Sequence, residues 1–323
     1  MKKLYLLITL VGIATSLISA CSKGVGGDVK TAEDSVISAD YIIEQLIEGK
    51  SIKLANKRIT GALDFTKAGL PNSNIAVSAV YVNEEVSFCN CVFDDSVSTY
   101  WDDNTLNAAE FTVFLKNVSF QECVFRKGIN MRQTDFRGRF DFDVSKVENL
   151  ADFSGARFGN GVSFRAANFN GDVFFVSCVF EGRANFFKVF FRNSVLMQYV
   201  RFYDIAMFSD TYFYGGVDIS KIFAGASIDF TNSKFFANLT MSNSDYLGDV
   251  RLVNCKFGKN FAFLGNKVIG TLNLNKSQIE GAVNLSDNIL LMSPEVREYT
   301  KGDSCSIIQK DNKTVNLIVK QII

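Results

Sequence analysis

From Phe114 to Leu290 the chain places an apolar residue at alternating steps of five and six residues, without a gap. We call these apolar residues the central residues, and 20 of the 31 phenylalanines are among them. An 11-residue period fits neither one amphipathic helix nor an alternating strand. Short fixed periods are typical of a solenoid, in which each repeat buries its apolar face against its neighbours. The central residues are Phe114, Phe120, Phe125, Met131, Phe136, Phe142, Val147, Phe153, Phe158, Phe164, Phe169, Phe175, Phe180, Phe186, Phe191, Met197, Phe202, Phe208, Phe213, Ile219, Ala224, Phe230, Phe235, Met241, Tyr246, Leu252, Phe257, Phe263, Val268, Leu274, Ile279, Leu285 and Leu290.

The residue two positions before each central residue is also patterned. Side chains two apart in extended chain point the same way, so both residues should face inward. Before the centres reached by a six-residue step this residue is always apolar, as at Val118 and Phe140. Before the five-step centres it is mostly smaller, as at Cys123 and Ser145. The pattern predicts a narrow, filled interior with one large and one small inward residue on each short segment.

The extra residue of the longer step has a composition of its own. Four positions before most six-step centres the chain has Gly, Asn or Asp, as at Gly138, Asn149 and Asp204. These residue types tolerate positive φ. We therefore expect a left-handed kink at these corners.

The stretch from Ala151 to Phe169, Ala-Asp-Phe-Ser-Gly-Ala-Arg-Phe-Gly-Asn-Gly-Val-Ser-Phe-Arg-Ala-Ala-Asn-Phe, resembles the pentapeptide-repeat family. It is most similar to the Phe-rich variety with an inserted Gly or Asn in every second repeat. The resemblance covers roughly residues 54–291. It implies an all-β fold, a right-handed quadrilateral β-helix with four repeats per coil, which we place at residues 50–291.

Both ends of such a solenoid need lids, because an open end exposes core and unpaired edge groups. Residues 38–49 have an N-cap serine, an apolar stripe and a terminal glycine, which predict a short capping helix. Residues 292–323 leave the period and form the C-terminal cap. Within them Ser306–Lys310 and Thr314–Ile323 read as two strands of a closing β-hairpin.

The first residues indicate export. Lys2 and Lys3 precede an apolar run that is too short for a membrane span, followed by Ile18-Ser-Ala-Cys21. A cysteine after small residues resembles the lipobox of bacterial lipoproteins, which implies a signal peptide at 1–20 and lipidation of Cys21. A plain signal peptide or an uncleaved anchor is the alternative. Residues 21–37 read as a flexible tether. We expect a membrane-anchored protein of the cell envelope, at the outer membrane or cell surface rather than the inner membrane.

Composition excludes several kinds of chemistry. Basic and acidic residues number 34 each, and removing the leader leaves 32 basic against 34 acidic residues. No basic face is concentrated for nucleic acid, so we expect no such partner. The chain has no histidine, which excludes Ser-His-Asp and Cys-His catalysis and His-ligated metals. We therefore expect no enzymatic activity, no cofactor and no metal.

The pattern predicts that the cysteines within the repeats are buried packing residues. Cys91, Cys123, Cys178 and Cys255 each lie two residues before a central Phe, where small inward side chains are expected. The pair Cys89 and Cys91 is a weak redox signal.

Two candidate sites are apparent. Residues flanking a central residue should point outward, and around Phe191, Phe213 and Phe235 these are aromatic at Phe190, Tyr212, Tyr214 and Phe236. An aromatic cluster on a polar solenoid suits a protein partner or sugar rings, and cross-strand stacking that merely steadies the sheet is the simpler alternative. The second candidate is the loop with Tyr100 and Trp101, in an irregular insert between residues 94 and 113 that also has four aspartates.

These features favour a non-enzymatic, lipid-anchored β-helix that acts as a scaffold or protein-interaction surface, with a homodimer as one form of contact. A carbohydrate-binding lipoprotein is the competing class. Pentapeptide solenoids that mimic DNA and bind gyrase are cytosolic and acidic, whereas this chain carries an export signal and is nearly neutral, so that role is the weakest of the three.

Overall fold

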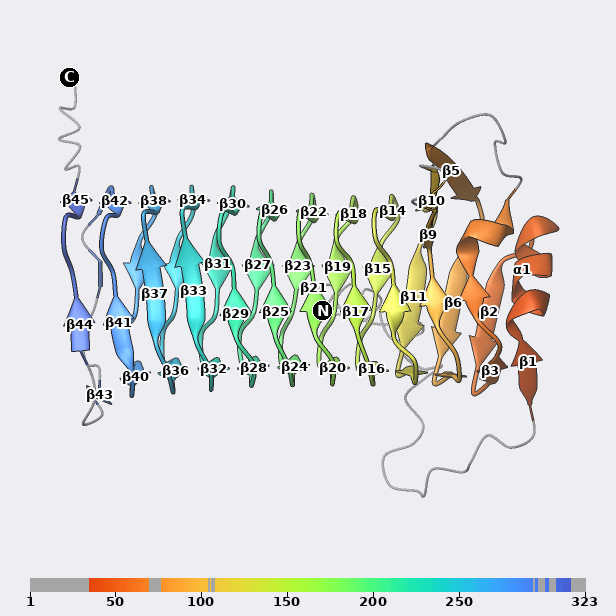
Figure 1. Cartoon of the computed structure of the whole chain (residues 1–323), viewed down its shortest axis with the longest axis horizontal. Coiled ribbons are helices and arrows are strands. Elements are labelled where there is room, and N and C mark those ends of the chain that lie inside the picture. Colours follow the sequence, from red (N-terminus) through yellow and green to blue (C-terminus); the bar gives the residue numbers. More distant parts are fainter. Residues whose placement is uncertain are drawn as a thin grey trace, which may run out of the picture.

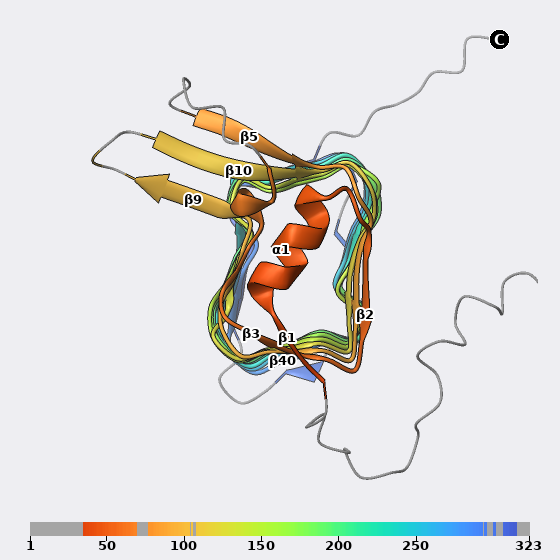
Figure 2. The ribbon, with the colours of Figure 1, turned by 90° about the vertical axis from the view of Figure 1, so that its right-hand side faces the viewer.

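The computed structural model describes residues 35–69, 77–103, 105, 108–292, 294–295, 300–301 and 306–314. Within these ranges the chain winds into a solenoid of short parallel strands (Figure 1). The strands form four walls, which we number 1 to 4 in chain order, and the outline seen along the long axis is quadrilateral (Figure 2). Wall 1 faces wall 3, and wall 2 faces wall 4. The predicted all-β, quadrilateral β-helix is therefore confirmed.

Walls 1 and 2 hold ten and twelve strands. Wall 1 consists of β2 (Ile52–Ala55), β6 (Val86–Cys89), β11 (Val118–Gln121), β15 (Phe140–Asp141), β19 (Val162–Ser163), β23 (Ala184–Asn185), β27 (Ala206–Met207), β31 (Ile228–Asp229), β35 (Val250–Arg251) and β39 (Leu272–Asn273). Wall 2 consists of β1 (Val36–Ser38), β3 (Arg58–Thr60), β7 (Val92–Phe93), β12 (Val124–Phe125), β16 (Lys146–Val147), β20 (Asn168–Phe169), β24 (Phe190–Phe191), β28 (Tyr212–Phe213), β32 (Lys234–Phe235), β36 (Lys256–Phe257), β40 (Gln278–Ile279) and β43 (Thr300–Lys301).

Walls 3 and 4 hold eleven and twelve strands. Wall 3 consists of β4 (Leu63–Asp64), β8 (Val97–Ser98), β13 (Ile129–Asn130), β17 (Ala151–Asp152), β21 (Val173–Phe174), β25 (Val195–Leu196), β29 (Val217–Asp218), β33 (Leu239–Ser242), β37 (Phe261–Leu264), β41 (Ala282–Asn284) and β44 (Ser306–Ile308). Wall 4 consists of β5 (Val77–Val82), β10 (Ala108–Phe114), β14 (Asp135–Phe136), β18 (Arg157–Phe158), β22 (Val179–Phe180), β26 (Arg201–Phe202), β30 (Phe223–Ala224), β34 (Asp245–Tyr246), β38 (Lys267–Val268), β42 (Ile289–Leu290) and β45 (Lys313–Thr314), with β9 (Tyr100–Asp103) paired to β10.

The interior is one continuous column of stacked side chains. Every central residue from Phe114 to Leu290 is no more than 3% exposed. Phe158, Phe180 and Phe202 illustrate the register, since successive ring centroids on wall 4 are 4.9 Å apart. The offset matches the spacing of neighbouring strands, so each ring covers the face of the next. The predicted filled interior is confirmed.

The small inward positions on walls 2 and 4 are often polar because they complete backbone hydrogen bonds between coils. The Ser145 hydroxyl accepts from the backbone N–H of Cys123 (2.9 Å) and donates to the Phe120 carbonyl (2.8 Å). Asn266 does the same with its amide, accepting from Ser244 N–H (3.0 Å) and donating to the Met241 carbonyl (3.0 Å). These side chains are buried and partnered, as buried polar groups must be. We name the residues at these positions slot residues.

The expected left-handed kinks are at different residues. Gly138 and Asn149 do not have positive φ. Instead, a left-handed residue occurs every eleven positions from Glu122 (φ 55°) to Asp287 (φ 60°), directly before each slot residue. The prediction was wrong because it placed the kink in the longer, six-residue corner. The shorter corner must turn the chain from one wall to the next in fewer residues and therefore needs the tighter conformation.

Glycine is needed at the six-residue corners for a different reason. A Cβ atom on Gly138 would clash with the backbone carbonyl group of Lys116 in the preceding coil. A Cβ atom on Gly215 would clash with the backbone of Asn193 in the same way. The backbones of neighbouring coils therefore approach closely at these corners, and glycine permits it.

Helix α1 (Ala39–Ile47) lies across the N-terminal end of the solenoid, where the sequence predicts the capping helix (Figure 2). The Ser38 hydroxyl accepts a hydrogen bond from the backbone N–H of Tyr41. The buried face consists of Ala39, Ile42, Ile43 and Leu46. The short 3₁₀ helix η1 (Phe65–Ala68) follows β4 in the first coil.

The described C-terminal residues pair with the walls of the solenoid, whereas nearly all of Thr314–Ile323, the second strand of the expected hairpin, lies outside the described residues. Strand β44 pairs in parallel with β41 on wall 3, and β45 pairs in parallel with β42 on wall 4. The two strands therefore continue the walls as one further coil. Asp311 supplies a left-handed residue between them (φ 54°), which serves as a coil corner and not as a hairpin turn.

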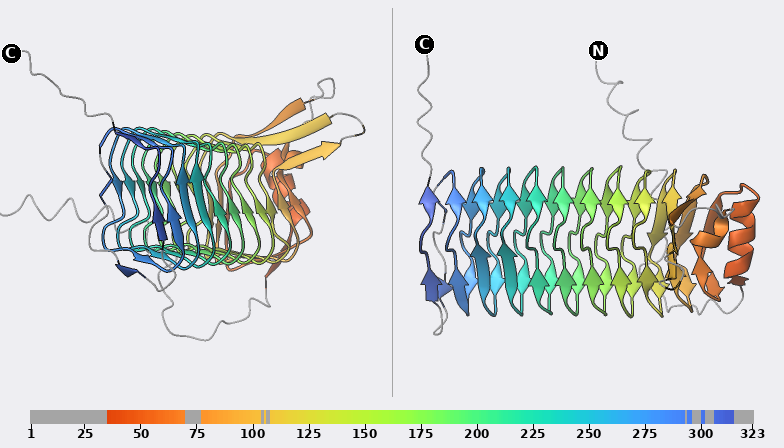
Figure 3. Two further views of the ribbon diagram at one scale, coloured as in Figure 1. Left: turned by 60° about the vertical axis from the view of Figure 1, so that its left-hand side comes forward. Right: turned by 45° about the horizontal axis from the view of Figure 1, so that its top comes forward.

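The insert with Tyr100 and Trp101 is also more regular than expected. Strand β5 pairs in parallel with β10, and β9 pairs antiparallel with it, with Trp101 opposite Glu110. These three strands extend wall 4 beyond the quadrilateral outline, near the N-terminal end (Figure 2 and Figure 3). We name this projection the wing. The prediction of a loop was wrong for Tyr100 and Trp101, which lie in a strand.

Candidate functional site

The outward side chains of wall 2 form two columns. Column 1 has the residue before each central residue, and column 2 has the residue after it. The register places Phe190 beside Tyr212, and Tyr212 beside Lys234, in successive coils. Phe190 and Tyr212 therefore share column 1, while Tyr214 and Phe236 share column 2. The structure thus brings the four predicted aromatic residues together on one wall.

Within each column the aromatic rings are stacked. The ring centroids of Phe190 and Tyr212 are 4.9 Å apart with planes inclined by 13°. Those of Tyr214 and Phe236 are 4.8 Å apart with planes inclined by 11°. Between the columns, the ring centroids of Tyr212 and Tyr214 are 6.5 Å apart. The four rings form one continuous aromatic surface.

A cation ends each stack. The Arg192 guanidinium lies 4.8 Å from the centroid of the Tyr214 ring, and the Lys234 ammonium lies 5.0 Å from that of Tyr212. Arg192 is also 5.8 Å from the Phe190 ring, which joins the columns. These distances suit cation–π attraction. We name the six residues Phe190, Arg192, Tyr212, Tyr214, Lys234 and Phe236 the aromatic grid.

The rings of the aromatic grid present their edges to solvent. Because they stack at the coil spacing, their planes lie across the solenoid axis. Tyr214 and Phe236 are 37% and 38% exposed, and Phe190 and Tyr212 are half-buried. Each of the four rings has the face that points into the aromatic grid covered by another ring or by a cation. The opposite face of Phe236 points along column 2 to Gly258 in the next coil, which has no side chain to cover it.

The wing residues lie elsewhere. Trp101 is 41% exposed, and the Tyr100 ring is covered by the Arg132 guanidinium at 4.8 Å. The wing extends wall 4, whereas the aromatic grid is on wall 2, the opposite face. The structure therefore does not combine the two predicted sites.

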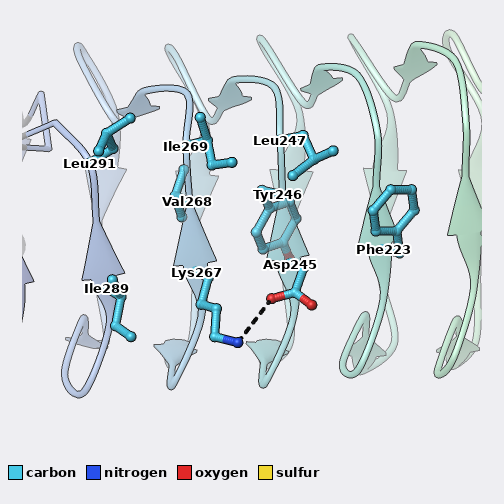
Figure 4. A pocket seen from close by; sticks show the side chains of 9 residues that line it. All are labelled: Phe223, Asp245, Tyr246, Leu247, Lys267, Val268, Ile269, Ile289 and Leu291. Carbon is cyan, nitrogen blue, oxygen red and sulfur yellow. Dashed lines mark ion pairs between the residues drawn. The ribbon is translucent and has the colours of Figure 1, made fainter. Parts of the chain in front are cut away.

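Wall 4 has a second apolar surface that the sequence analysis missed. Phe223, Leu247, Ile269, Ile289 and Leu291 line a shallow pocket of about 310 Å³ (Figure 4). An ion pair between Lys267 and Asp245 (3.8 Å) lies at its edge. The signal was present in the sequence, because the same flanking columns around Tyr246, Val268 and Leu290 are rich in Leu and Ile.

The aspartates of the insert bind different partners. Asp94 is held by Arg58 and Arg126. The Asp95 carboxylate accepts a hydrogen bond from the backbone N–H of Ser96 (2.8 Å). The Asp103 carboxylate accepts hydrogen bonds from the backbone N–H and the hydroxyl of Thr105. Among the described residues, no group of three or more acidic or thiol side chains is placed to hold a metal ion.

The free thiols of the described chain, on Cys91, Cys123, Cys178 and Cys255, are all buried. They occupy slot positions, and Cys178 and Cys255 each direct their sulfur to a carbonyl of the preceding coil at 3.0 Å. Burial raises the pKa of the Cys178 and Cys255 thiols far above the usual value. These two thiols are therefore protonated and take the place of serine, as the packing interpretation predicts. Cys89 is disulfide-bonded.

Comparison of the chain with protein-family models, curated proteins and solved structures gives no significant match. No helix in the described ranges is long and apolar enough to cross a membrane. Cys21 and the predicted signal peptide at 1–20 lie outside the described residues.

Proposed function

We propose that this protein is a non-enzymatic, lipid-anchored scaffold of the pentapeptide-repeat type, and that wall 2 is its interaction surface in the bacterial cell envelope. The observation that carries the proposal is the aromatic grid: four stacked rings and two cations on a straight wall. Arg and Tyr are typical of interface cores, and a rigid scaffold presents them with little loss of conformational entropy on binding.

The proposed anchor is Cys21. The lipobox-like sequence Ile18-Ser-Ala-Cys21 supports it. Several acyl chains on one cysteine bind a bilayer stably, whereas one chain binds it marginally. The outer membrane or the cell surface is the location that this anchor favours.

A protein partner suits the aromatic grid better than a carbohydrate. Sugars stack on ring faces, and here the inner faces are already covered by neighbouring rings and by Arg192 and Lys234. What remains is mainly ring edges, tyrosine hydroxyls and cations, which suit protein side chains. The face of Phe236 beside Gly258 is the feature that favours a glycan, and it is a single platform.

The surface charges argue against DNA mimicry. Acidic groups on the walls are paired with bases, as in the Arg157 ion pairs with Asp135 (3.1 Å) and Glu181 (2.8 Å). A DNA mimic must instead present unneutralised rows of acid, because duplex DNA carries one charge per ~1.7 Å.

The proposal is tested by affinity capture from envelope extracts with the full chain in mild detergent, alongside a glycan array. Tyr212→Ser with Tyr214→Ser should abolish capture of a protein partner and leave the melting temperature nearly unchanged. Tyr199→Ser with Tyr203→Ser is the matched control, because these tyrosines are 51% and 49% exposed outside the aromatic grid. Equal loss in both double variants, or glycan binding lost with Phe236→Ser alone, would contradict a protein-binding wall 2.

A further inference from the structure

The residue types of the aromatic grid are arranged symmetrically about the row of Phe213. Phe190 corresponds to Phe236, Arg192 to Lys234, and Tyr212 to Tyr214. We call each central residue of wall 2 with its two flanking residues a row. The two members of each pair lie in different columns. Phe190 and Arg192 are one row before Phe213, and Lys234 and Phe236 are one row after it. The aromatic grid therefore consists of two chemically equivalent halves. This internal symmetry runs about the normal to wall 2, so two such faces brought together on a twofold axis in the plane of the wall pair each cation with a ring, as an isologous contact requires.

From this arrangement we propose that wall 2 binds wall 2 of a second copy of the chain, around a twofold axis parallel to the solenoid axis. The inference rests on the proposed function and names the partner. Such an axis brings column 1 of one copy against column 2 of the other, row by row. Phe190 then meets Arg192 of the second copy, Tyr212 meets Tyr214, and Lys234 meets Phe236. Every cation meets a ring, and the tyrosine hydroxyls meet one another.

The rows beyond the aromatic grid agree with this orientation. Lys146 is in column 1 and Glu148 in column 2, where they form an ion pair of 2.9 Å within the chain. In the dimer each Lys146 also faces Glu148 of the second copy, giving four alternating charges. In the described rows from Val124 to Glu280, no row has like charges in both columns. No row therefore places like charges opposite each other.

The antiparallel alternative is less favourable. A twofold axis along the strands at the Tyr212 row would place column 1 against column 1 and column 2 against column 2. The order of the rows in the second copy would then be reversed. Glu148 would then face Glu280 of the second copy, which lies three rows away on the other side of Tyr214. Like charges placed directly opposite are destabilising. The parallel axis avoids this contact and also leaves both N-terminal ends at the same end of the dimer.

The contact is two columns wide, so it belongs to the small class of interfaces. We expect a dissociation constant on the order of micromolar. The first test measures self-association of the full chain in mild detergent by light scattering across the micromolar range. Lys146→Glu should weaken it roughly tenfold, since it replaces two exposed attractions by repulsions. Lys146→Glu with Glu148→Lys restores opposite charges in the row and should restore the dimer. Weakening without rescue would overturn the proposed axis.

The second test fixes the orientation by disulfide trapping. A tagged Tyr212→Cys chain mixed with an untagged Tyr214→Cys chain should form a mixed disulfide under glutathione exchange. In this exchange two thiols become one disulfide, and oxidised glutathione is reduced to two thiols. Tyr212→Cys alone should cross-link poorly, and the parent chain is the control for native cysteines. Efficient cross-linking of Tyr212→Cys with itself would overturn the parallel axis.

The outcomes separate this inference from the proposed function. A monomeric full chain at all concentrations, with partner capture still dependent on Tyr212 and Tyr214, overturns the dimer and leaves the interaction surface intact. A dimer that is insensitive to every wall 2 substitution overturns the dimer surface proposed here. If neither self-association nor capture responds to those substitutions, both ideas are wrong.

Discussion

At the scale of single residues, the tight corners store strain. Non-glycine residues in the left-handed region lose roughly 1–2 kcal/mol, with Asn and Asp losing less. The chain nevertheless has Val144 (φ 61°), Lys188 (φ 58°) and Tyr199 (φ 62°) at this position. The conformation persists because each corner is fixed by the parallel strands on either side and by the buried central residues that follow.

The corner strain leads to a first prediction. Val144→Asn should raise the free energy of unfolding by about 1 kcal/mol, because Val144 is β-branched and 47% exposed, and so gives up little packing. The reverse change, Asn243→Val at φ 53°, should lower it by a similar amount. Urea denaturation measures both. Shifts of the same sign would show that corner conformation does not control stability.

A second prediction separates inside from outside. Phe180→Ala should cost about 3–5 kcal/mol, because Phe180 is fully buried between Phe158 and Phe202. Phe236→Ala removes the same atoms from an exposed wall position and should cost much less, since surface substitutions usually stay within about 0.5 kcal/mol. Comparable losses in the two variants would mean that the inward and outward assignments are wrong.

At the scale of elements, the slot residues join coils that are otherwise connected by two-residue strands. On wall 4 the ladder runs from Ser244 through Asn266 and Asn288 to Asn312. Each side chain accepts from the backbone N–H of the slot one coil before it. Asn266 and Asn288 also donate to central-residue carbonyls, those of Met241 and Phe263. The ladder compensates for the short strands with side-chain hydrogen bonds.

The ladder predicts an order of tolerance at Asn266. Serine should be tolerated, because Ser233 and Ser277 make both bonds in equivalent slots on wall 2. Valine should be worse than serine by about 1–3 kcal/mol, because it leaves the Ser244 N–H and the Met241 carbonyl without partners. Thermal or urea unfolding of the two variants decides this. Valine equal to or better than serine would exclude a role for the hydrogen bonds.

Asn266→Asp should add a dependence on pH. A buried carboxylate lacks the donor that the Met241 carbonyl requires, so burial should raise its pKa in the folded state. The variant is then most stable relative to the parent below the unfolded pKa of about 4, and it loses about 1.4 kcal/mol for each pH unit from there up to the folded pKa. Unfolding measured from acid to neutral pH checks the sign. A difference that stays flat would contradict a buried, neutral carboxyl.

The regular coils were predictable because one physical rule, burial of a central residue at five and six steps, fixes both wall and register. The aromatic grid followed from that rule, since the flanking positions must point outward. The left-handed corner did not follow, because Glu122, Val144 and Lys188 share no residue type that signals it. The wing and the final coil were missed because the five-and-six period lapses there. The final coil pairs at a separation of 24 residues, as in Ile289 with Lys313, and β5 pairs with β10 at 32, as in Val77 with Ala109, instead of the regular 22.

At the scale of the whole molecule, the solenoid has a helix-covered N-terminal end and two different opposite faces. Wall 2 has the aromatic grid, and wall 4 has the apolar pocket and the wing. A scaffold with different opposite faces can hold two partners at once without either covering the other. The proposed anchor at Cys21 would hold it at a membrane by its N-terminal side.

Anchoring gives a prediction for the whole protein. Cys21→Ser should leave the precursor uncleaved or move the protein out of the detergent phase, because it removes the sulfur that we propose is acylated. Cys178→Ser is the matched control and should partition like the parent, because this free, buried thiol already takes the place of a serine. Phase separation followed by immunoblotting measures both the cleavage and the partition. Unchanged behaviour of the Cys21 variant would remove the lipoprotein assignment.

The eleven-residue spacing of the corners makes this molecule respond to length changes in two distinct ways. Duplication of 22 residues, one complete coil, lengthens the rod and leaves every column continuous. Duplication of eleven residues preserves the five-and-six alternation and hence the core, but rotates everything downstream by half a coil. Inserted after Arg192, it would leave Phe190 on its original face and carry Tyr212, Tyr214 and Phe236 to the opposite one. Half-coil insertions thus act as a phase shift: they preserve folding and divide the surface.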